Sequence, residues 1–177
     1  MTDLMIILGC PASGKTTLAR RLAADLAVPI LSKDDIKEAL FDVLGVGDRQ
    51  GSRRLSDACF AAQLRMAETQ LTAGLSCLVE GNWRAEHAGG VRKVLACSGA
   101  RAAQVWCRAS AAEILRRFTA RDRHPGHLDA AGLAPEVAQT AGLPPVFLDL
   151  DGPRWIYDSE LPEAYPALAG DLKIWHL

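Results

Sequence analysis

The sequence predicts an α/β fold, a three-layer sandwich in which a five-stranded parallel sheet lies between two layers of helices. Two observations lead to this prediction. Short, unbroken apolar runs alternate along the chain with longer segments of helical spacing, which is the pattern of βαβ crossover units. Polar or glycine-rich clusters follow several apolar runs, and the carboxyl ends of parallel strands share one edge of a sheet. We therefore expect these clusters to converge into one site.

The first 75 residues supply two of the strands and three helices. Residues 4–8 form a continuous apolar run that ends at Gly9, as in a strand covered on both faces. Leu18, Leu22 and Leu26 share one face of the helix that follows. The expected elements are a strand at 4–8, a helix at 15–27, a strand at 29–31, a helix capped by Ser32 with Ile36, Leu40 and Phe41 on its apolar face, a polar linker at 45–54, and a helix at 54–73 that Gly74 ends.

The rest of the chain repeats this alternation of strands and helices. The expected elements are strands at 77–79 and 102–107, a helix at 85–96, an arginine-rich helix at 111–121, a loop at 123–131, one or two helical turns at 136–141, a turn at 149–152 and a last strand at 172–175. The sequence contains no internal repeat and no linker long enough to separate domains. Residues 1–177 are therefore expected to form a single domain.

Composition restricts the classes of partner. The formal net charge is −1, from 20 basic and 21 acidic residues, so a broad basic surface for nucleic acid is not expected. No apolar run approaches the roughly 20 residues that cross a bilayer, and the apolar run at the start is too short for a signal peptide. The five cysteines form no CxxC pair, which favours reduced thiols. We expect a cytoplasmic protein without a membrane partner; the sequence does not indicate an oligomeric state.

The strongest motif is Gly9-Cys10-Pro11-Ala12-Ser13-Gly14-Lys15-Thr16, which stands between the first strand and the first helix. Its glycines let successive backbone N–H groups point at phosphate oxygens, and the helix N-terminus adds a favourable dipole. Lys15 would reach the β- and γ-phosphates of ATP, and the Thr16 hydroxyl would hold Mg²⁺. The motif predicts a P-loop NTPase. The expected nucleotide-binding residues are Gly9, Pro11, Ala12, Ser13, Gly14, Lys15, Thr16 and Thr17, with Arg117 and Arg121 from a helical lid.

Carboxylates follow two other strands. Asp34 and Asp35 stand at a helix N-terminus, where acids also complement the helix dipole. Their strand is expected to neighbour the P-loop strand, so that a carboxylate could accept the proton of a hydroxyl that attacks phosphate. Glu80 ends the third strand and could hold the acceptor or a Mg²⁺-bound water, or be a solvated charge. Asn82 is a further candidate for substrate contact.

An arginine-rich segment precedes the loop at 123–131. Arg117 and Arg121 are four residues apart and are expected to share a helix face, whereas Arg116 should point elsewhere. Such arginines can stabilise the negative charge of a phosphoryl group in the transition state and exclude water, or they can form a solvated cationic face. His124 and His127 are expected to be surface residues.

With these segments placed, the chain resembles small P-loop kinases: the 5′-kinase domain of polynucleotide kinase, the zeta toxins and chloramphenicol phosphotransferase, which have an AAA-type ATP-binding domain. The resemblance covers about residues 3–128 and is closest at 9–16 and 32–37. It implies that Asp34 is the base, that Lys37 contacts acceptor or phosphate, that Glu80 lies in the acceptor site and that Arg117 and Arg121 contact ATP from a lid. The segments at 42–75 and 128–165 match no particular member.

These observations predict an ATP- and Mg²⁺-dependent kinase that transfers the γ-phosphate to a hydroxyl of a small metabolite or antibiotic. Asp34, Lys15, Arg117 and Arg121 would be catalytic, and Asp34, Asp35, Lys37, Glu80 and Asn82 would bind the acceptor. Two alternatives remain. One is a kinase of nucleic-acid 5′-hydroxyls or of nucleotide sugars, as in toxins. The other is a nucleotide-hydrolysing regulatory protein, although the sequence lacks the Asn-Lys-x-Asp element of guanine-reading switches.

Overall fold

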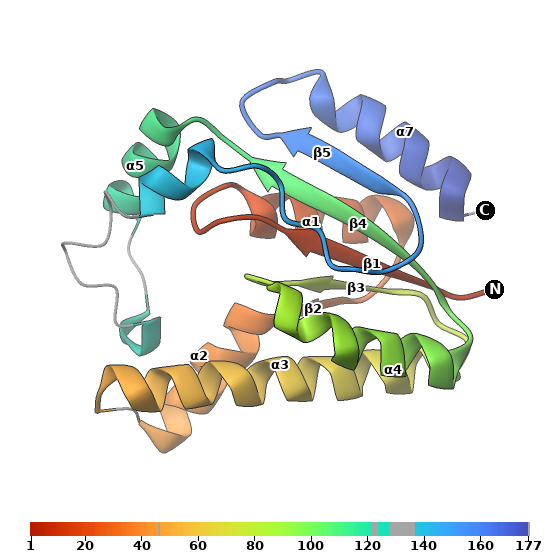
Figure 1. Cartoon of the computed structure of the whole chain (residues 1–177), viewed down its shortest axis with the longest axis horizontal. Helices are drawn as coiled ribbons and strands as arrows, with labels where there is room; N and C mark the ends of the chain where they lie inside the picture. Colours follow the sequence, from red (N-terminus) through yellow and green to blue (C-terminus); the bar gives the residue numbers. More distant parts are fainter. Residues whose placement is uncertain (46, 122–123, 128–136, 177) are drawn as a thin grey trace.

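The computed structural model describes residues 1–45, 47–121, 124–127 and 137–176. Its centre is a five-stranded parallel sheet with the strand order β2-β3-β1-β4-β5. The strands are β1 (Asp3–Leu8), β2 (Ile30–Ser32), β3 (Cys77–Glu80), β4 (Arg101–Arg108) and β5 (Arg154–Asp158). The predicted fold class, a parallel α/β sandwich, is confirmed (Figure 1).

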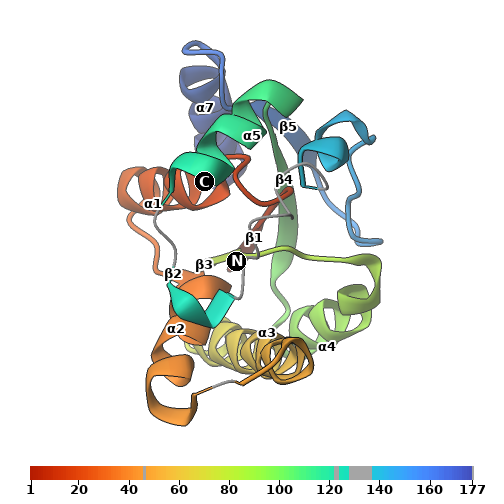
Figure 2. The same ribbon diagram turned by 90° about the vertical axis from the view of Figure 1, so that its left-hand side faces the viewer.

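Helices cover both faces of the sheet (Figures 1 and 2). On one face lie α3 (Arg49–Thr72) and α4 (Ala88–Ser98), and on the other α1 (Lys15–Leu26) and α7 (Ala164–His176). Helix α2 (Lys33–Leu44) packs beside α3, and α5 (Ala111–Ala120) lies at the edge where the strands end. The described residues also include three short 3-10 helices, η1 (Ala85–His87), η2 (Pro125–His127) and η3 (Thr140–Gly142).

Strand β1 packs against helices on both of its faces, and this explains why its sequence is apolar at every position without alternating. Leu4, Ile6 and Leu8 pack toward α3 and α4, whereas Met5 and Ile7 pack toward α1 and α7. All five side chains are fully buried. Burying one such side chain stabilises the fold by about 1.5–3 kcal/mol. The strand that leads into the glycine motif is therefore buried on both faces.

Polar side chains fix the starts of two helices next to the carboxyl edge of the sheet. Ser32 Oγ accepts a hydrogen bond from the Asp35 N–H at 3.3 Å at the start of α2, and Ser110 Oγ accepts one from the Glu113 N–H at 3.3 Å at the start of α5. Asp48 caps α3 in the same way. Because of this cap, α3 begins at Arg49, and the predicted linker at 45–54 is largely helical.

The structure corrects two predictions about the sheet. Residues 172–175 are not a strand; they belong to α7, because Tyr165, Leu168, Ala169 and Leu172 form a buried helical face. The fifth strand is β5. The second correction concerns β2, which pairs with β3 and not with β1, so that the strand ending in Glu80 is the neighbour of the P-loop strand.

Two predicted segments after α5 lie partly outside the described residues. Within the loop predicted at 123–131, residues 123 and 128–131 are not described, and 125–127 form η2. Within the turns predicted at 136–141, residue 136 is not described, and the rest is helical up to η3.

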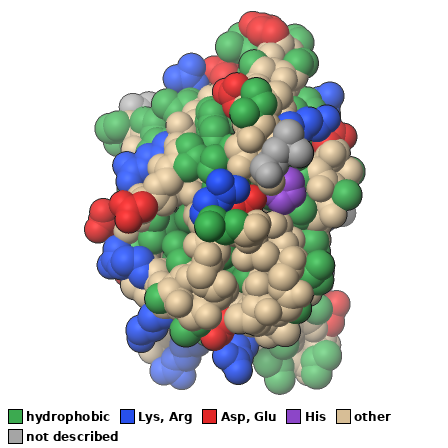
Figure 3. Space-filling model, turned by 90° about the vertical axis from the view of Figure 1, so that its right-hand side faces the viewer, with side chains coloured by type: hydrophobic (Ala, Val, Ile, Leu, Met, Phe, Trp, Pro, Cys, Tyr) green, Lys and Arg blue, Asp and Glu red, His purple; other side chains and the backbone are tan. Residues whose placement is uncertain are grey.

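The surface carries charges of both signs. Figure 3 views the end of the molecule where the two chain termini lie, and acidic and basic side chains are both present on it. In the described part of the chain, no helix is both long and apolar enough to cross a membrane.

Candidate active site

The loop between β1 and α1 is closely surrounded by other elements. Gly9 has φ 140°, and a Cβ atom there would lie 2.3 Å from the Cys107 carbonyl oxygen. Gly14 has φ 95°, and a Cβ atom there would lie 3.1 Å from Ser159 Cβ. Both positions favour glycine, because the positive φ is unfavourable for a residue with a side chain; at Gly9 a Cβ atom would also clash with the backbone, and at Gly14 it would make a tight contact. Ala12 is also left-handed, with φ 64°. The loop therefore has the backbone of an anion-binding nest.

Lys15 begins α1, and its side chain folds back over the loop. Its Nζ atom donates a hydrogen bond to the Cys10 carbonyl oxygen at 3.0 Å, and the side chain is buried. The Ser13 hydroxyl is also buried, and it has no hydrogen-bond partner among the described residues. A buried hydroxyl normally has a partner, so an unpaired one in this loop fits a site that is completed by a ligand.

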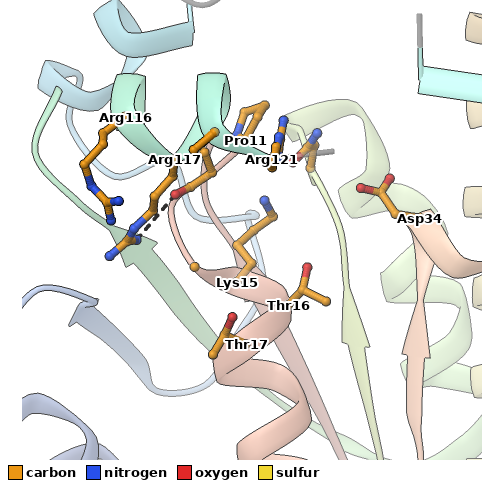
Figure 4. A pocket seen from close by; sticks show the side chains of 12 residues that line it. Pro11, Lys15, Thr16, Thr17, Asp34, Arg116, Arg117 and Arg121 are labelled. Carbon is orange, nitrogen blue, oxygen red and sulfur yellow. Dashed lines mark hydrogen bonds between the residues drawn. The ribbon is translucent and has the colours of Figure 1, made fainter. Parts of the chain in front are cut away.

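A cavity of about 410 Å³ lies above this loop. Figure 4 shows Lys15 and Thr16 rising into it from the loop, Arg116, Arg117 and Arg121 facing them from α5 and its end, and Asp34 on the far side. The lining residues are Pro11, Ala12, Gly14, Lys15, Thr16, Thr17, Asp34, Asn82, Arg116, Arg117, Ala120 and Arg121. Residues from four separate polar clusters of the sequence therefore share one cavity.

Helix α5 presents three arginines to the cavity. Arg117 donates to Ser159 Oγ at 2.8 Å and to the Ala12 carbonyl oxygen at 3.4 Å, which brings its guanidinium onto the loop. Arg121 follows the last helical residue in an extended conformation, with its guanidinium over the Phe118 ring. Arg116 lines the cavity as well, so the prediction that it points elsewhere is wrong.

Glu113 holds two of these arginines. Its carboxylate accepts hydrogen bonds of 2.6 Å from Arg117 Nε and from Arg116 Nε and Nη2. The bonds from Arg116, and then those from Arg117, lower the pKa of Glu113 to about 2. The carboxylate is therefore ionised at neutral pH, and both guanidinium groups have an anionic partner.

The two aspartates after β2 have different surroundings. Asp34 lines the cavity, and its carboxylate accepts a hydrogen bond from Lys33 Nζ at 2.9 Å. Asp35 is exposed and pairs with Arg20 at 3.4 Å on the outer side of α2. Lys37 is buried and donates to Ser52 Oγ at 2.7 Å. Of the five predicted acceptor-binding residues, Asp34 and Asn82 line the cavity, and Asp35, Lys37 and Glu80 are not among its lining residues.

Glu80 lies beneath the cavity at the end of β3 and is only 2% exposed. Burial raises the pKa of its carboxyl, and the positive charge of Lys15 offsets this in part. Ser32 donates a hydrogen bond to Glu80 Oε2 at 3.2 Å. The buried side chain of Gln63, on α3, donates to the carbonyl oxygens of Leu31 at 2.6 Å and of Glu80 at 2.8 Å. The ends of β2 and β3 are thus tied together where the two acidic segments begin.

The segment after α5 contacts α2. His124 Nε2 lies 2.9 Å from Asp42 Oδ1, and His127 Nε2 lies 2.8 Å from Glu38 Oε1. Gly126 sits so close to the Phe41 ring that a Cβ atom would lie 2.6 Å from Cγ. Gly126 is buried and the His127 side chain is only 5% exposed, so the prediction that His127 is a surface residue is wrong. The described part of this segment contacts α2, the helix that carries Asp34.

A smaller hollow of about 300 Å³ adjoins the first on the side away from Asp34. It shares Gly14, Thr17 and Arg117 with the cavity and extends to Tyr157 and Ser159. Sequence reasoning missed Ser159, Glu113 and Arg116 as members of this region. Glu113 had a usable signal, since it stands three and four residues before two arginines. Ser159 had none, because only the pairing of β4 with β5 brings it to the loop.

Comparisons with known proteins agree with this geometry. The model of a family described as AAA domain matches residues 4–143. A "putative kinase" from Chloroflexus aurantiacus J-10-fl is 34% identical, with 100% of both chains covered and a TM-score of 0.88. No curated protein matches the chain.

More distant structures share the fold. An APS kinase from Mycobacterium tuberculosis, solved with AMPPNP and APS, is 20% identical over 97% of this chain and 98% of its own, with a TM-score of 0.59. Kti12 from Chaetomium thermophilum, solved with ADP-AlF3, is 14% identical over 98% of this chain and 99% of its own, with a TM-score of 0.67. Given the match over residues 4–143 and the five-stranded parallel sheet around a glycine loop, the chain belongs to the AAA domain family and has a kinase-like P-loop fold.

Proposed function

We propose that the protein is an ATP-dependent kinase that transfers the γ-phosphate of ATP to a hydroxyl of a small molecule. The observation that carries the proposal is the position of Asp34. It lines the same cavity as the phosphate-binding loop and the arginines of α5, but on the opposite wall. A carboxylate at this position can orient an acceptor hydroxyl and accept its proton as the bond to phosphorus forms, which is what a kinase requires.

ATP would lie across the two adjoining hollows. The loop amides and Lys15 would bind the β- and γ-phosphates, and the nucleoside would extend through Gly14 and Thr17 into the smaller hollow beside Tyr157 and Ser159. Arg117 lines both hollows, so it would contact the phosphates from above. The resident ion would be Mg²⁺, held by the Thr16 hydroxyl together with phosphate oxygens, and it would neutralise charge on those oxygens.

The transfer would then proceed in line across the cavity. Asp34 would orient the acceptor hydroxyl and take its proton as the new O–P bond forms and the bond between the γ-phosphorus and the bridging oxygen breaks, which releases ADP. Lys15, Arg116, Arg117 and Arg121 would stabilise the charge on the transferred phosphoryl oxygens. Glu80 would act from below on Lys15 and the loop, since burial keeps it out of the cavity lining.

Small-molecule acceptors are consistent with the known relatives of this fold. A shikimate kinase from Acinetobacter baumannii was solved with shikimate, and the APS kinase was solved with APS. The net charge of −1 also favours a small acceptor over a nucleic-acid strand. We further propose a cytoplasmic location for a protein of this kind.

The test is transfer of label from γ-labelled ATP, with Mg²⁺, by the wild type and by Asp34→Asn, Asp35→Asn and Glu80→Gln. We expect label in a small-molecule acceptor and a loss of at least about 100-fold in kcat for Asp34→Asn, the low end of the usual effect of a general base. Nucleotide binding by Asp34→Asn should change little. Asp149→Asn, which alters an exposed aspartate far from the cavity, is the matched control.

The position of the label distinguishes the proposed kinase from the alternative functions. Equal release of inorganic phosphate by the wild type and Asp34→Asn, with no labelled acceptor, would instead support a hydrolysing regulatory protein. Label in 5′-hydroxyl oligonucleotides or in nucleotide sugars would support the toxin-like alternatives. A loss confined to Asp35→Asn or Glu80→Gln would move the role of base to that residue.

A further inference from the structure

A third hollow, of about 470 Å³, adjoins the phosphate cavity on the side of Asp34. It lies between the first half of α3, which supplies Arg53, Ser56 and Phe60, and the segment after β3, which supplies Asn82 and His87. Asn82 lines both the third hollow and the phosphate cavity. Lys33 lines the third hollow and donates a hydrogen bond to Asp34, which lines the phosphate cavity. A molecule in the third hollow would therefore reach Asp34 by passing Asn82.

The floor of this hollow is built by close packing. The Phe60 ring is buried and lies 4.1 Å from the His87 ring and 4.9 Å from the Trp83 ring, measured between centroids. A Cβ atom at Gly81 would lie 3.1 Å from Phe60 and 3.2 Å from Lys33. The hollow is thus preformed by tightly packed side chains, and its volume is that of a small-molecule site.

The interior of the hollow offers hydrogen bonds without net charge. The groups available are the Asn82 amide, the His87 ring and the oxygen of the Ser56 hydroxyl, which donates its own proton to the Ser52 carbonyl oxygen at 3.0 Å and can still accept a hydrogen bond. His87 Nδ1 accepts a hydrogen bond from the Arg84 N–H at 2.9 Å, which leaves Nε2 as the donor. Burial, above all, lowers the pKa of His87, so the ring is neutral at neutral pH. The Phe60 ring adds an apolar surface beside these groups.

The hollow is lined by three basic residues, Lys33, Arg53 and Arg84, and two acidic ones, Asp57 and Glu86, and Asp34 of the adjoining cavity brings the charges into balance. Lys33 is paired with Asp34 at 2.9 Å, and Arg84 is paired with Glu86 at 3.7 Å on the rim. Arg53 and Asp57 lie one turn apart on the same face of α3 and both line the hollow. An anionic or cationic molecule would therefore gain little net Coulomb attraction, whereas a neutral molecule with several hydroxyls would find a partner for each.

We propose that this hollow binds the phosphoryl acceptor and that the acceptor is an uncharged, polyhydroxylated small molecule of the sugar or polyol class. The inference rests on the proposed kinase function and adds the acceptor site and its class. One hydroxyl of the bound molecule would project past Asn82 to Asp34, while its other hydroxyls would bond to Ser56 and His87 and its carbon face would pack on Phe60.

The first experiment offers γ-labelled ATP, Mg²⁺ and three pools of small hydroxylated metabolites to the wild-type protein. The pools hold neutral polyols and sugars, hydroxy acids, and sugar phosphates. We expect label in the neutral pool. Label only in the hydroxy acids or only in the sugar phosphates would overturn the acceptor class. Label in none of the pools would count against the kinase proposal itself, which separates the two failures.

The second experiment blocks the hollow. Ser56→Trp fills it, whereas Ala58→Trp places the same side chain on an exposed position of α3 outside it. For the labelled neutral acceptor, we expect Ser56→Trp to reduce kcat/KM by roughly tenfold or more, and Ala58→Trp to leave it unchanged. Titration with a non-hydrolysable ATP analogue should show that both variants still bind nucleotide.

A further variant guards against misfolding of Ser56→Trp. Glu86→Trp alters the exposed rim on the opposite wall, where a large side chain is easily accommodated, and should also raise the KM for the acceptor. If Ser56→Trp or Glu86→Trp binds nucleotide and transfers phosphate with the same kcat/KM as Ala58→Trp, the acceptor does not lie in this hollow and the inference is wrong.

Discussion

At the scale of single residues, two side chains of the same type in adjacent positions can have different surroundings in the folded protein. Asp34 and Asp35 are adjacent acids at the same helix start, yet one lines the cavity and the other pairs with Arg20 in solvent. Helical geometry sends neighbouring residues about 100° apart, so Asp34 can face the cavity while Asp35 points to solvent. The sequence placed both at the site because it does not disclose the rotation of α2 about its axis.

The buried environment of Glu80 also affects the stability of the fold. Because burial raises its pKa, the folded state binds more protons than the unfolded state between the ordinary pKa, about 4.3, and the raised one. The free energy of unfolding therefore falls as pH rises through that window, and the cost persists above it. Glu80→Gln keeps an oxygen for the Ser32 hydroxyl and removes the charge. We expect its Tm to match that of the wild type near about pH 4 and to exceed it near about pH 8.

Thermal unfolding of both proteins without nucleotide, across this pH range, provides the measurement. A difference in Tm that stays constant with pH would show that Glu80 titrates normally and that its burial is relieved in solution.

Glu113 leads to a prediction about the arginines. Its carboxylate is the shared partner of Arg116 and Arg117, and loss of its charge would free both guanidinium groups to move. We expect Glu113→Gln to lower kcat about tenfold or more, by the loss of orientation, with no dependence on pH, since the pKa is about 2. Glu68→Gln is a matched control, because Glu68 pairs with Arg65 at the same spacing on α3. Steady-state kinetics that are alike for the two variants would rule out this positioning role.

At the scale of elements, short-range patterns identified most helices, but tertiary pairing decided the last strand. The apolar residues at 172–175 looked like a strand because the helical face that begins at Tyr165 was not recognised. The strand that does complete the sheet, β5, lies at its edge. Its three central residues, Trp155, Ile156 and Tyr157, favour a strand, but so short a run between two charged residues is a weak signal. Pairing with β4 stabilises β5, and such a partner is invisible in a local pattern.

The contact between η2 and α2 is a second property of elements. Gly126→Ala would put a methyl group against the Phe41 ring and push η2 away from α2. Because His124 and His127 bond to acids of α2 from the same segment, those contacts should weaken too. We expect faster amide hydrogen exchange in α2 and a lower kcat.

Gly170→Ala is the control for this prediction. Nothing lies within 4 Å of a Cβ atom there, so alanine should stabilise α7 by about 0.5–1 kcal/mol and leave exchange in α2 unchanged. If Gly126→Ala leaves exchange in α2 at the wild-type rate, the packing of η2 does not stabilise that helix.

At the scale of the whole molecule, the sequence predicted the architecture and the location of the site, but not the detailed wall of the cavity. The glycine motif determines the backbone of its own loop and the start of the helix that follows, so the phosphate-binding loop could be predicted from the sequence. Arg116, Ser159 and the third hollow depend on how α5, β5 and α3 pack around the sheet edge. The strand order likewise depends on crossovers, and it placed Glu80, not Asp34, beside β1.

Nucleotide binding should stabilise the whole fold, since the P-loop joins the central strand to α1 and the cavity is closed by α5 and by the start of α2. A ligand at about 100 times its Kd adds about 2.7 kcal/mol to the free energy of unfolding. For a chain of this length, that corresponds to a rise in Tm of roughly 5–10 °C. We expect this rise with a non-hydrolysable ATP analogue and Mg²⁺, and little of it for Lys15→Ala, which loses the buried ammonium at the phosphates. Lys173→Ala, an exposed lysine of α7, should retain the full rise. An equal shift in Lys15→Ala and Lys173→Ala would mean that the analogue binds elsewhere and that the loop is not the nucleotide site.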